Sequence, residues 1–334
     1  MTALPPLTAA PLDEAEAEAA FGALLDGKVD DNAIAAFLIA LSARGETASE
    51  IAGAARAMRA RMIPARAPEG AIDVCGTGGD GHHTLNVSTA VALVVAACGV
   101  PVAKHGNRAA SSKAGAADTL EALGLNLARA AETAEATLAD LGIGFLFAAS
   151  HHPAMARIMP IRRAIGQRTI FNLMGPLANP AGVRRQLVGI ARPAYVPIYA
   201  EALRLLGTDR SQVVSGDEGL DELSLAGGNE LAEVAHDRVT MHRVEANQAG
   251  LASAPVSAIR GGDAAHNAAA LRALLLGEQG PYRDAVLFNA AAALIVADHA
   301  ADWTGGVEEA AEAIDKGLAK TLLDCWIAAT GGRA

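Results

Sequence analysis

Cysteine and aromatic residues are scarce in this sequence, and positive charge is in deficit. The three cysteines, Cys75, Cys98 and Cys325, lie far apart among 334 residues, so they predict neither a disulfide framework nor a metal-ligand spacing. The 27 basic and 37 acidic residues give a formal charge of −10, which disfavours nucleic acid and anionic membranes as partners. No uninterrupted apolar run is long enough to span a bilayer, and no secretory signal is recognisable. We therefore expect a cytoplasmic protein that binds neither nucleic acid nor membrane.

Hydrophobic residues make up 51% of the chain, enough for a large core divided between two domains. Three apolar-patterned segments predict a small all-helical domain over residues 1–68, completed by helices within 152–180. The third segment opens with a capping box formed by Thr47 and Glu50. Residues 64–70, PARAPEG, then read as a linker.

Residues 69–334 follow a different pattern, in which short β-branched runs alternate with helical segments. The runs are AIDVC, VPVA, IGFLF, RQLVGIA and SQVVS, and their alternation predicts parallel strands joined by crossover helices. Residues 230–244, ELAEVAHDRVTMHRV, instead alternate like a pair of antiparallel strands. The expected fold is α/β, with a small all-helical domain plus a larger α/β domain whose mostly parallel central sheet has an antiparallel addition.

The stretch GTGGDGHHTLNVST, residues 76–89, leads from the strand AIDVC into a helix starting near Ser88. Its glycines allow a tight turn and expose N–H groups to a ligand, while Ser88 and Thr89 can cap the helix. The stretch matches G-x-G-x-x-G but lacks the later acid that a dinucleotide site needs, and it lacks the Walker lysine. No acid but several bases occur from 82 to 117. This region therefore predicts a site for a strongly anionic ligand such as phosphate.

A second polar loop follows the next predicted strand, within VAKHGNRAASSKAGAADTLEALG. Lys104 supplies a point charge, and the donors of Gly106, Ser111 and Ser112 suit phosphate or sugar oxygens. Asn107 offers both a donor and an acceptor, which favours an organic substrate over bare phosphate. The two loops together predict a cradle for a phosphorylated substrate.

The charges beside this second loop have two interpretations. Arg108 and Lys113 can contribute to the anion site, or they can be surface charges that balance Asp118 and Glu121. The sequence favours neither interpretation.

A concentration of carboxylates follows the predicted strand SQVVS. Residues 216–223, GDEGLDEL, carry four carboxylates in six positions. Carboxylates repel one another, so their concentration at a strand end indicates a hard cation such as Mg²⁺, which takes one or two carboxylates together with substrate phosphates. We select Asp221 and Glu222 as its ligands; an acid-rich surface turn is the alternative.

Residues 151–180 combine an apolar stripe with several arginines. The Met and Ile positions are typical of a helix that packs into a core. Arg162, Arg163 and Arg168 are each able to hold a substrate carboxylate in a bidentate pair. Spacing alone does not choose among them.

Four segments carry a family resemblance: GTGGDGHHTLNVST, KHGNRAASSKAGAADTLEALG, HPAMARIMPIRRAIGQRTIFNLMGPLANP and GLDE. In this order, and over nearly the whole chain, they resemble the anthranilate phosphoribosyltransferases of tryptophan biosynthesis. The resemblance implies transfer of phosphoribose from phosphoribosyl pyrophosphate (PRPP) to the amine of anthranilate. It places PRPP contacts at Gly76, Gly79, Asp80, Thr84, Asn86, Val87, Ser88, Thr89, Lys104, His105, Gly106, Asn107, Arg108, Ala109, Ala110, Ser111, Ser112 and Ala116.

The same resemblance assigns the other ligands. It implies anthranilate contacts at Gly76, Asn107 and Arg162, and magnesium ligands at Ser88, Asp221 and Glu222, with two ions per subunit. It also implies a homodimer formed through the helical domains, and no dedicated acid or base beside the electrostatic Lys104.

Departures from the family pattern are few. Leu85 stands where many members have Phe, and Ala114 and Ala116 stand where many have Ser. Two other classes share part of these features. They are pyrimidine nucleoside phosphorylases of the same fold, for which the arginine clamp has no role, and non-catalytic relatives that bind nucleic acid, which the acidic charge disfavours.

Overall fold

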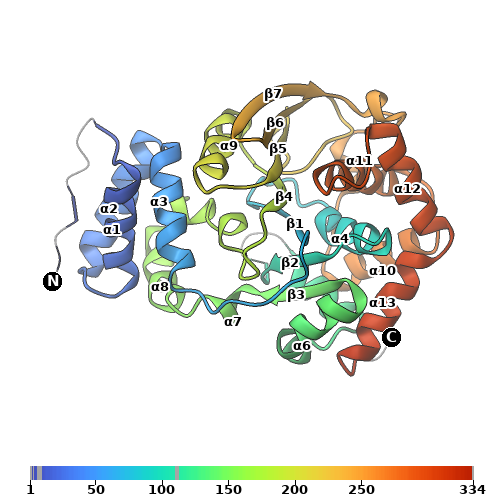
Figure 1. The fold of residues 1–334 in the computed structure, drawn as a ribbon, viewed down its shortest axis with the longest axis horizontal. Coiled ribbons are helices and arrows are strands. Elements are labelled where there is room, and N and C mark those ends of the chain that lie inside the picture. Colours follow the sequence, from blue (N-terminus) through green and yellow to red (C-terminus); the bar gives the residue numbers. More distant parts are fainter. Residues whose placement is uncertain (1, 3, 6–9, 110–112, 333–334) are drawn as a thin grey trace.

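The computed structural model describes all residues except 1, 3, 6–9, 110–112 and 333–334. A unit of four helices lies at one end of the molecule (Figure 1). Acidic or hydroxyl side chains cap its first three helices, and the predicted Thr47–Glu50 capping box is confirmed. The helices are α1 (Glu14–Leu25), α2 (Asp31–Arg44), α3 (Ala48–Arg59) and α8 (Met155–Ile165).

A seven-stranded sheet forms the centre of the molecule, with the strand order β3-β2-β1-β4-β5-β6-β7. The first five strands are parallel, and the last two add an antiparallel hairpin beside β5. The expected fold class is confirmed, antiparallel addition included. The strands are β1 (Ile72–Gly76), β2 (Val102–Gly106), β3 (Ile143–Phe147), β4 (Arg185–Gly189), β5 (Arg210–Gly216), β6 (Asn229–Ala235) and β7 (Arg238–Val244).

The strand order reverses between β1 and β4, which are direct neighbours although two strands separate them in the chain. In open α/β sheets, ligands bind outside the carboxyl ends of the strands at such a switch point. The loop 76–89 leaves the carboxyl end of β1 at this place, and Gly76 pairs with Gly189 at the end of β4. The topology therefore places the glycine-rich loop where a ligand site is expected.

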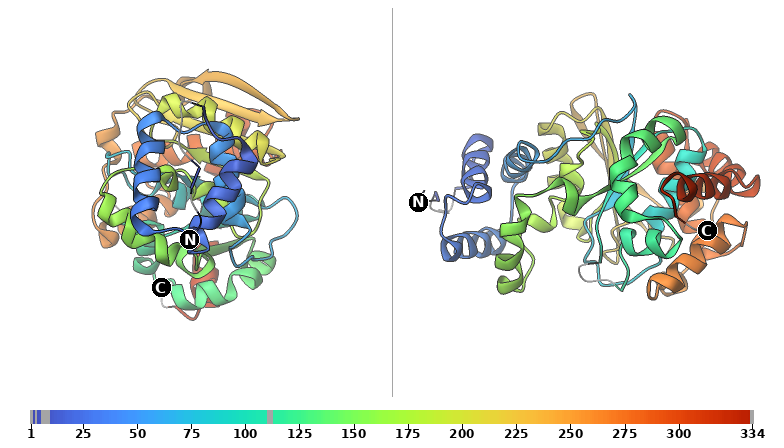
Figure 2. Two further views of the ribbon diagram at one scale, coloured as in Figure 1. Left: turned by 90° about the vertical axis from the view of Figure 1, so that its left-hand side faces the viewer. Right: turned by 90° about the horizontal axis from the view of Figure 1, so that it is seen from below.

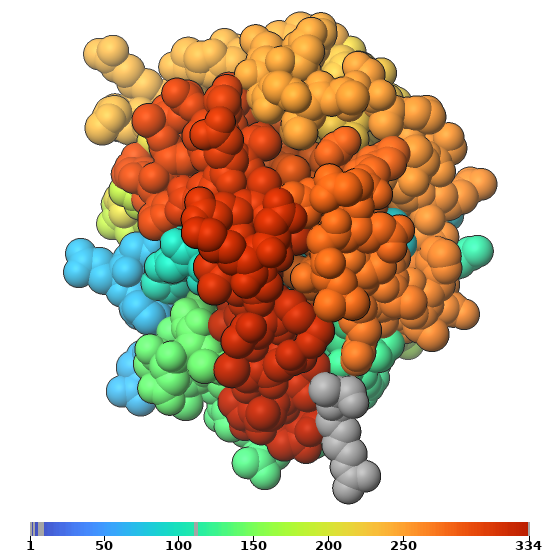
Figure 3. Space-filling view, turned by 90° about the vertical axis from the view of Figure 1, so that its right-hand side faces the viewer, coloured from blue at the N-terminus to red at the C-terminus, as the bar shows by residue number. Residues whose placement is uncertain are grey.

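Helices cover both faces of the sheet and build two large cores. The first core joins the sheet to α4 (Val87–Ala97), α5 (Ala116–Ala122) and the C-terminal helices. Of those helices, α10 (Ala264–Leu275), α12 (Trp303–Asp315) and α13 (Leu318–Ala329) form the outer face drawn in Figure 3. Helix α11 (Pro281–Val296) is almost entirely buried. The second core joins the four-helix unit to α9 (Val196–Leu205) and to Val188 and Val213 of the sheet.

Two helices lie beside the edge strand β3. Helix α6 (Leu127–Leu141) packs beside β3, and α7 (Ala148–His151) follows that strand directly. Figure 2 shows the helical unit projecting from the end of the α/β body. Ile158 and Ile161 of α8 are buried in the core that this unit shares with α9. A domain boundary at residues 68 and 69, with the helical domain completed from 152–180, stays a prediction.

Two further observations concern the cysteines and the length of the helices. Cys75, Cys98 and Cys325 are all unpaired. Within the described residues, no helix combines the length and the apolar character that crossing a membrane requires.

Candidate active site

The first half of the glycine-rich loop turns tightly against a carboxylate. A Cβ on Gly76 would lie only 2.4 Å from Asp221 Oδ2, so only glycine fits there. The Gly78 N–H donates to the same oxygen at 2.6 Å. Gly78, Gly79 and Gly81 all have positive φ angles, which side chains rarely adopt. The glycines predicted to shape this loop therefore do so, and Asp221 lies directly beneath it.

The N-terminus of α4 differs from the expectation. Ser88 and Thr89 are not the caps that the sequence predicted, because the helix begins at Val87 and its N-cap is Asn86, whose side chain makes no capping bond. Instead the Ser88 N–H donates to Glu222 Oε1 at 3.1 Å. A carboxylate from a distant loop thus takes the place of a local cap, which the positive end of the helix favours.

Asp221 and Glu222 lie side by side in a region of repelling carboxylates. Burial and the neighbouring Asp80 raise the pKa of Asp221 to about 7. Burial and then Asp221 raise the pKa of Glu222 well above its usual value. Glu222 Oε2 is shielded from solvent and has no hydrogen-bond partner in the described part of the chain. A cation would satisfy that oxygen and relieve the repulsion, so these residues fit Mg²⁺.

The protein ligands for such an ion are few. Over the described residues, no group of three or more His, Cys, Asp or Glu side chains forms a cage for a metal. Mg²⁺ commonly binds through one or two carboxylates together with waters and substrate phosphates, without a cage made entirely of protein. The two neighbouring carboxylates therefore suit an ion that arrives with a phosphorylated substrate.

Lys104 is the central residue of β2, and its side chain is almost completely buried. Its Nζ donates to the Val74 carbonyl at 2.9 Å and to Ser88 Oγ at 3.4 Å. Burial lowers the pKa of Lys104, and the facing Asp73 carboxylate opposes that shift. The ammonium group is thus fixed under the first turn of α4, on the same side as Glu222.

The later half of the first loop is anchored from two directions. Asn86 Oδ1 accepts from Thr119 Oγ1 at 2.5 Å and from Asn267 Nδ2 at 2.8 Å, which links the loop to α5 and α10. Thr84 forms a β-bridge with Arg260. Thr89 Oγ1 is buried and unpartnered within the described residues, so a hydroxyl donor remains for a ligand.

In the second loop, the structure decides between the two interpretations of Arg108. Arg108 donates to Asp118 at 2.9 Å and to Glu121 at 2.8 Å, so it forms the surface ion pairs that the sequence allowed. Asn107 Oδ1 accepts from the Arg108 N–H at 2.8 Å. The predicted contacts Ala110, Ser111 and Ser112 lie outside the described residues.

Three arginines were candidates for a carboxylate clamp, and the structure separates them. Arg163 is exposed, and Arg168 donates to carbonyls of the glycine-rich loop. Arg162 is half-buried, with Nη1 3.8 Å from Met159 Sδ and Cζ 5.8 Å from the centre of the Phe171 ring. Burial lowers the pKa of Arg162, and no described carboxylate pairs with it. Arg162 and Arg163 therefore both lack a protein carboxylate within the described residues, and Arg162 is the more buried of the two.

The sequence did not predict that two buried histidines, His105 and His152, lie in contact. His105 Nε2 and His152 Nε2 are 3.3 Å apart, and His105 Nδ1 lies 3.1 Å from the Gly175 carbonyl. Burial is the main cause that lowers the pKa of His105 to about 3 and of His152 to about 4, so both are neutral at pH 7. The His105 side chain therefore lies with His152 rather than with the anion loops. Only the position of His152 before α8 hinted at this contact.

A helical bundle beside an α/β sheet, with an anion loop at the switch point and a carboxylate pair beneath it, defines a class of sugar-transferring enzymes. Two family models agree with this arrangement. The helical bundle domain of a glycosyl transferase family matches residues 7–62, and the a/b domain of that family matches residues 68–320. The chain is thus a member of this glycosyl transferase class.

Curated relatives and solved structures narrow the class. The chain is 81% identical over 319 residues to the anthranilate phosphoribosyltransferase of Novosphingobium aromaticivorans, covering 96% of this chain and 97% of the relative. It is 73% identical to that of Sphingopyxis alaskensis, covering 95% and 96%. The Thermus thermophilus crystal structure superposes with a TM-score of 0.92 at 44% identity, covering 97% of each chain. The chain belongs to the anthranilate phosphoribosyltransferase family.

A second similar solved structure contains bound ligands. It is the anthranilate phosphoribosyltransferase of Saccharomyces cerevisiae in complex with PRPP and Mg, with a TM-score of 0.87 at 28% identity, covering 96% of this chain and 94% of that one.

Proposed function

We propose that this protein transfers the phosphoribosyl group of PRPP to the amine of anthranilate, giving N-(5-phosphoribosyl)-anthranilate and pyrophosphate in tryptophan biosynthesis. The observation that carries this proposal is the meeting of the glycine-rich loop, Lys104 and the Asp221–Glu222 pair at the switch point of the sheet. These groups suit a diphosphate with its counter-ion. The family relatives act, by their names, on the same pair of substrates.

The chain supplies electrostatic stabilisation to the leaving group. As the bond between ribose and diphosphate breaks, negative charge grows on the pyrophosphate. The fixed Lys104 ammonium, the loop N–H groups and the first turn of α4 lie where they can meet that charge. Because these groups are held by strands and helices, they need little reorganisation during the reaction.

Anthranilate needs no strong base to become a nucleophile. An aromatic amine is already neutral at pH 7, so its lone pair is available. We assign its carboxylate to Arg162, with Asn107 and Gly76 as the further contacts. The absence of a protein carboxylate beside Arg162 over the described residues, and its partial burial, support that role. The carboxylate of anthranilate would then orient the molecule in the site.

We assign magnesium to Ser88, Asp221 and Glu222, with two ions per subunit. The unpartnered Glu222 Oε2 and the raised pKa values of both carboxyl groups support this assignment. When bound, the ion neutralises charge on the diphosphate. The PRPP contacts that the resemblance implied complete the proposed site: Gly76, Gly79, Asp80, Thr84, Asn86, Val87, Ser88 and Thr89 in the first loop, and Lys104 to Ser112 with Ala116 in the second. His105 and Arg108 would contribute their backbone, because their side chains contact His152 and the Asp118 and Glu121 carboxylates.

Three further features belong to the same proposal. Residues 64–70 serve as a hinge between the helical domain, 1–68, and the α/β domain, 69–334, so that closure excludes water from the activated ribose. The protein is a homodimer formed through its helical domains, which is supported by the exposure of Ile39 on α2. It works in the cytoplasm, a location supported by its three unpaired cysteines.

The reaction is tested by mixing the protein with PRPP, Mg²⁺ and anthranilate and following the loss of anthranilate fluorescence. We expect consumption of anthranilate that requires all three components, with pyrophosphate released in equal amount. Phosphorolysis of a pyrimidine nucleoside without anthranilate turnover would contradict the proposal and favour the phosphorylase alternative.

A further inference from the structure

The glycine-rich loop is held from outside the α/β body by one arginine. Arg168 follows α8, and its Nη1 donates to the Gly79 carbonyl at 3.0 Å and to the Gly78 carbonyl at 3.3 Å. The approach is close, because a Cβ on Gly79 would lie 2.6 Å from the same nitrogen. Two consecutive carbonyls of the loop therefore face one guanidinium.

These two bonds fix where the next N–H groups point. In a planar trans peptide, the carbonyl of one residue and the N–H of the next point in opposite directions, and no cis peptide is present in the described chain. The N–H groups of Gly79 and Asp80 therefore point away from Arg168. Neither has a hydrogen-bond partner within the described residues, whereas the Gly78 N–H is already taken by Asp221. The loop thus presents two free donors on its other face.

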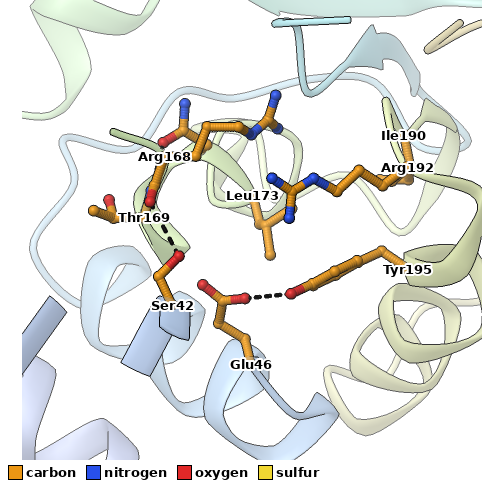
Figure 4. A pocket seen from close by; sticks show the side chains of 9 residues that line it. Ser42, Glu46, Arg168, Thr169, Leu173, Ile190, Arg192 and Tyr195 are labelled. Atoms are coloured by element: carbon orange, nitrogen blue, oxygen red, sulfur yellow. Dashed lines mark hydrogen bonds between the residues drawn. The ribbon is translucent and has the colours of Figure 1, made fainter. Parts of the chain in front are cut away.

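Arg168 is itself held by the helical unit. Ser42 of α2 donates from its hydroxyl to the Arg168 carbonyl at 3.1 Å, as Figure 4 shows. Glu46 lines the same pocket, accepts from Tyr195 at 2.6 Å and attracts the Arg168 guanidinium. A displacement of α2 would therefore move Arg168, and with it the two carbonyls of the loop.

We propose that Arg168 is a positioning residue for PRPP, which holds the Gly78 and Gly79 carbonyls so that the Gly79 and Asp80 N–H groups face the diphosphate. Because Ser42 of α2 is hydrogen-bonded to Arg168, the orientation of these two N–H groups also depends on the position of α2. The inference rests on the proposed function and deepens it, because it names a residue outside the assigned contacts that governs affinity for one of the two substrates.

The test is titration of PRPP into Arg168→Ala, followed by steady-state kinetics with both substrates. We expect PRPP to bind about tenfold to a hundredfold more weakly, in line with the loss of charge-assisted hydrogen bonds. The KM for PRPP should rise by a similar factor, while the KM for anthranilate changes less than about twofold. Arg163→Ala removes an exposed arginine from α8 and should leave PRPP binding unchanged. Thermal unfolding of each variant without ligand measures its folding separately.

Two further variants distinguish positioning from simple attraction. Arg168→Lys keeps the charge but not the planar fork, so it should recover only part of the PRPP affinity. Ser42→Ala removes the bond from α2 and should weaken PRPP binding about twofold to fivefold, because one neutral hydrogen bond is lost. If Arg168→Ala does not fold, these two variants carry the test by themselves.

The outcomes separate this inference from the function on which it rests. PRPP affinity in Arg168→Ala equal to that of the wild type, or full recovery in Arg168→Lys, would overturn the positioning role while the wild-type reaction stands. A wild-type protein that does not consume PRPP would instead overturn the proposed function. Weakened PRPP binding in Arg168→Ala, partial recovery with lysine and a small effect of Ser42→Ala would support the proposal.

Discussion

The two sides of the proposed cleft are built differently. On the diphosphate side, Lys104 and Glu222 are hydrogen-bonded to the side chain and the backbone of Ser88 respectively, and the Gly78 N–H donates to Asp221. On the acceptor side, the Arg162 guanidinium has only a thioether and an aromatic ring as partners among the described residues. If these assignments hold, the diphosphate wall is organised before the substrate arrives, whereas the acceptor wall keeps its main charge free for the substrate.

The largest expected effect comes from the organised wall. Glu222→Gln should lower turnover by about a hundredfold or more, because it removes one of the two carboxylates assigned to Mg²⁺, and the ion neutralises the charge that grows on the diphosphate. The melting temperature without ligand should not fall, since the change also removes a carboxylate that repels Asp221.

Kinetics and thermal unfolding of Glu222→Gln measure these two effects separately, and a chelator added to the wild type should abolish turnover until Mg²⁺ is restored. Full activity in chelator would rule out the metal assignment.

The next largest effect is expected from Lys104→Ala, and it should appear as weaker binding of PRPP. We expect PRPP affinity to fall about tenfold to a hundredfold, because a fixed charge is lost from the diphosphate side. Some stability should also be lost, because the buried Asp73 carboxylate would no longer face a cation. Calorimetry with PRPP measures the first effect. Lys316→Ala, which removes an exposed positive charge on α12, is the control for net charge.

Arg162→Ala should weaken the binding of anthranilate without weakening that of PRPP. Without the guanidinium, the KM for anthranilate should rise about tenfold to a hundredfold, and Arg162→Lys should recover only part of that loss. Steady-state kinetics with both substrates measures this effect beside Arg163→Ala. If Arg163→Ala carries the anthranilate defect instead, the register assigned to α8 is wrong.

The last effect is on stability in mild acid, and it does not involve the substrates. Burial holds His105 neutral with a pKa of about 3, whereas an unfolded histidine has a pKa near 6.5. Below pH 6.5 the unfolded chain takes up a proton that the folded chain excludes, so stability present above pH 6.5 is lost as the pH falls toward 3.

At pH 5 this loss should reach about 2 kcal/mol from His105 alone. Urea unfolding of wild type and of His105→Asn at pH 7 and pH 5 measures it. An equal loss in both proteins would show that His105 is not the group responsible.

Local features of the chain predicted most of the fold. The capping box at Thr47 and Glu50, the β-branched runs and the alternation over 230–244 depend on neighbours in sequence, and each has the expected element. The glycine-rich loop was predicted for the same reason, since its positive φ angles need glycine wherever it lies.

Long-range contacts account for what the sequence did not reveal. The cap of α4 was misassigned because its true partner, Glu222, is 134 residues from Ser88. The bonds from Arg168 to the loop cross about 90 residues and leave no trace in local spacing. Arg108 had two equally good local interpretations, and only its placement beside Asp118 and Glu121 decided between them.

The division of the two substrates between the two walls is tested most directly by one crossed titration. PRPP and anthranilate, the latter with pyrophosphate and Mg²⁺ present, are each titrated calorimetrically into Lys104→Ala and Arg162→Ala. The account predicts that Lys104→Ala loses affinity mainly for PRPP and that Arg162→Ala loses it mainly for anthranilate. Equal losses for both ligands in either variant would contradict a cleft with one prepared wall and one open wall.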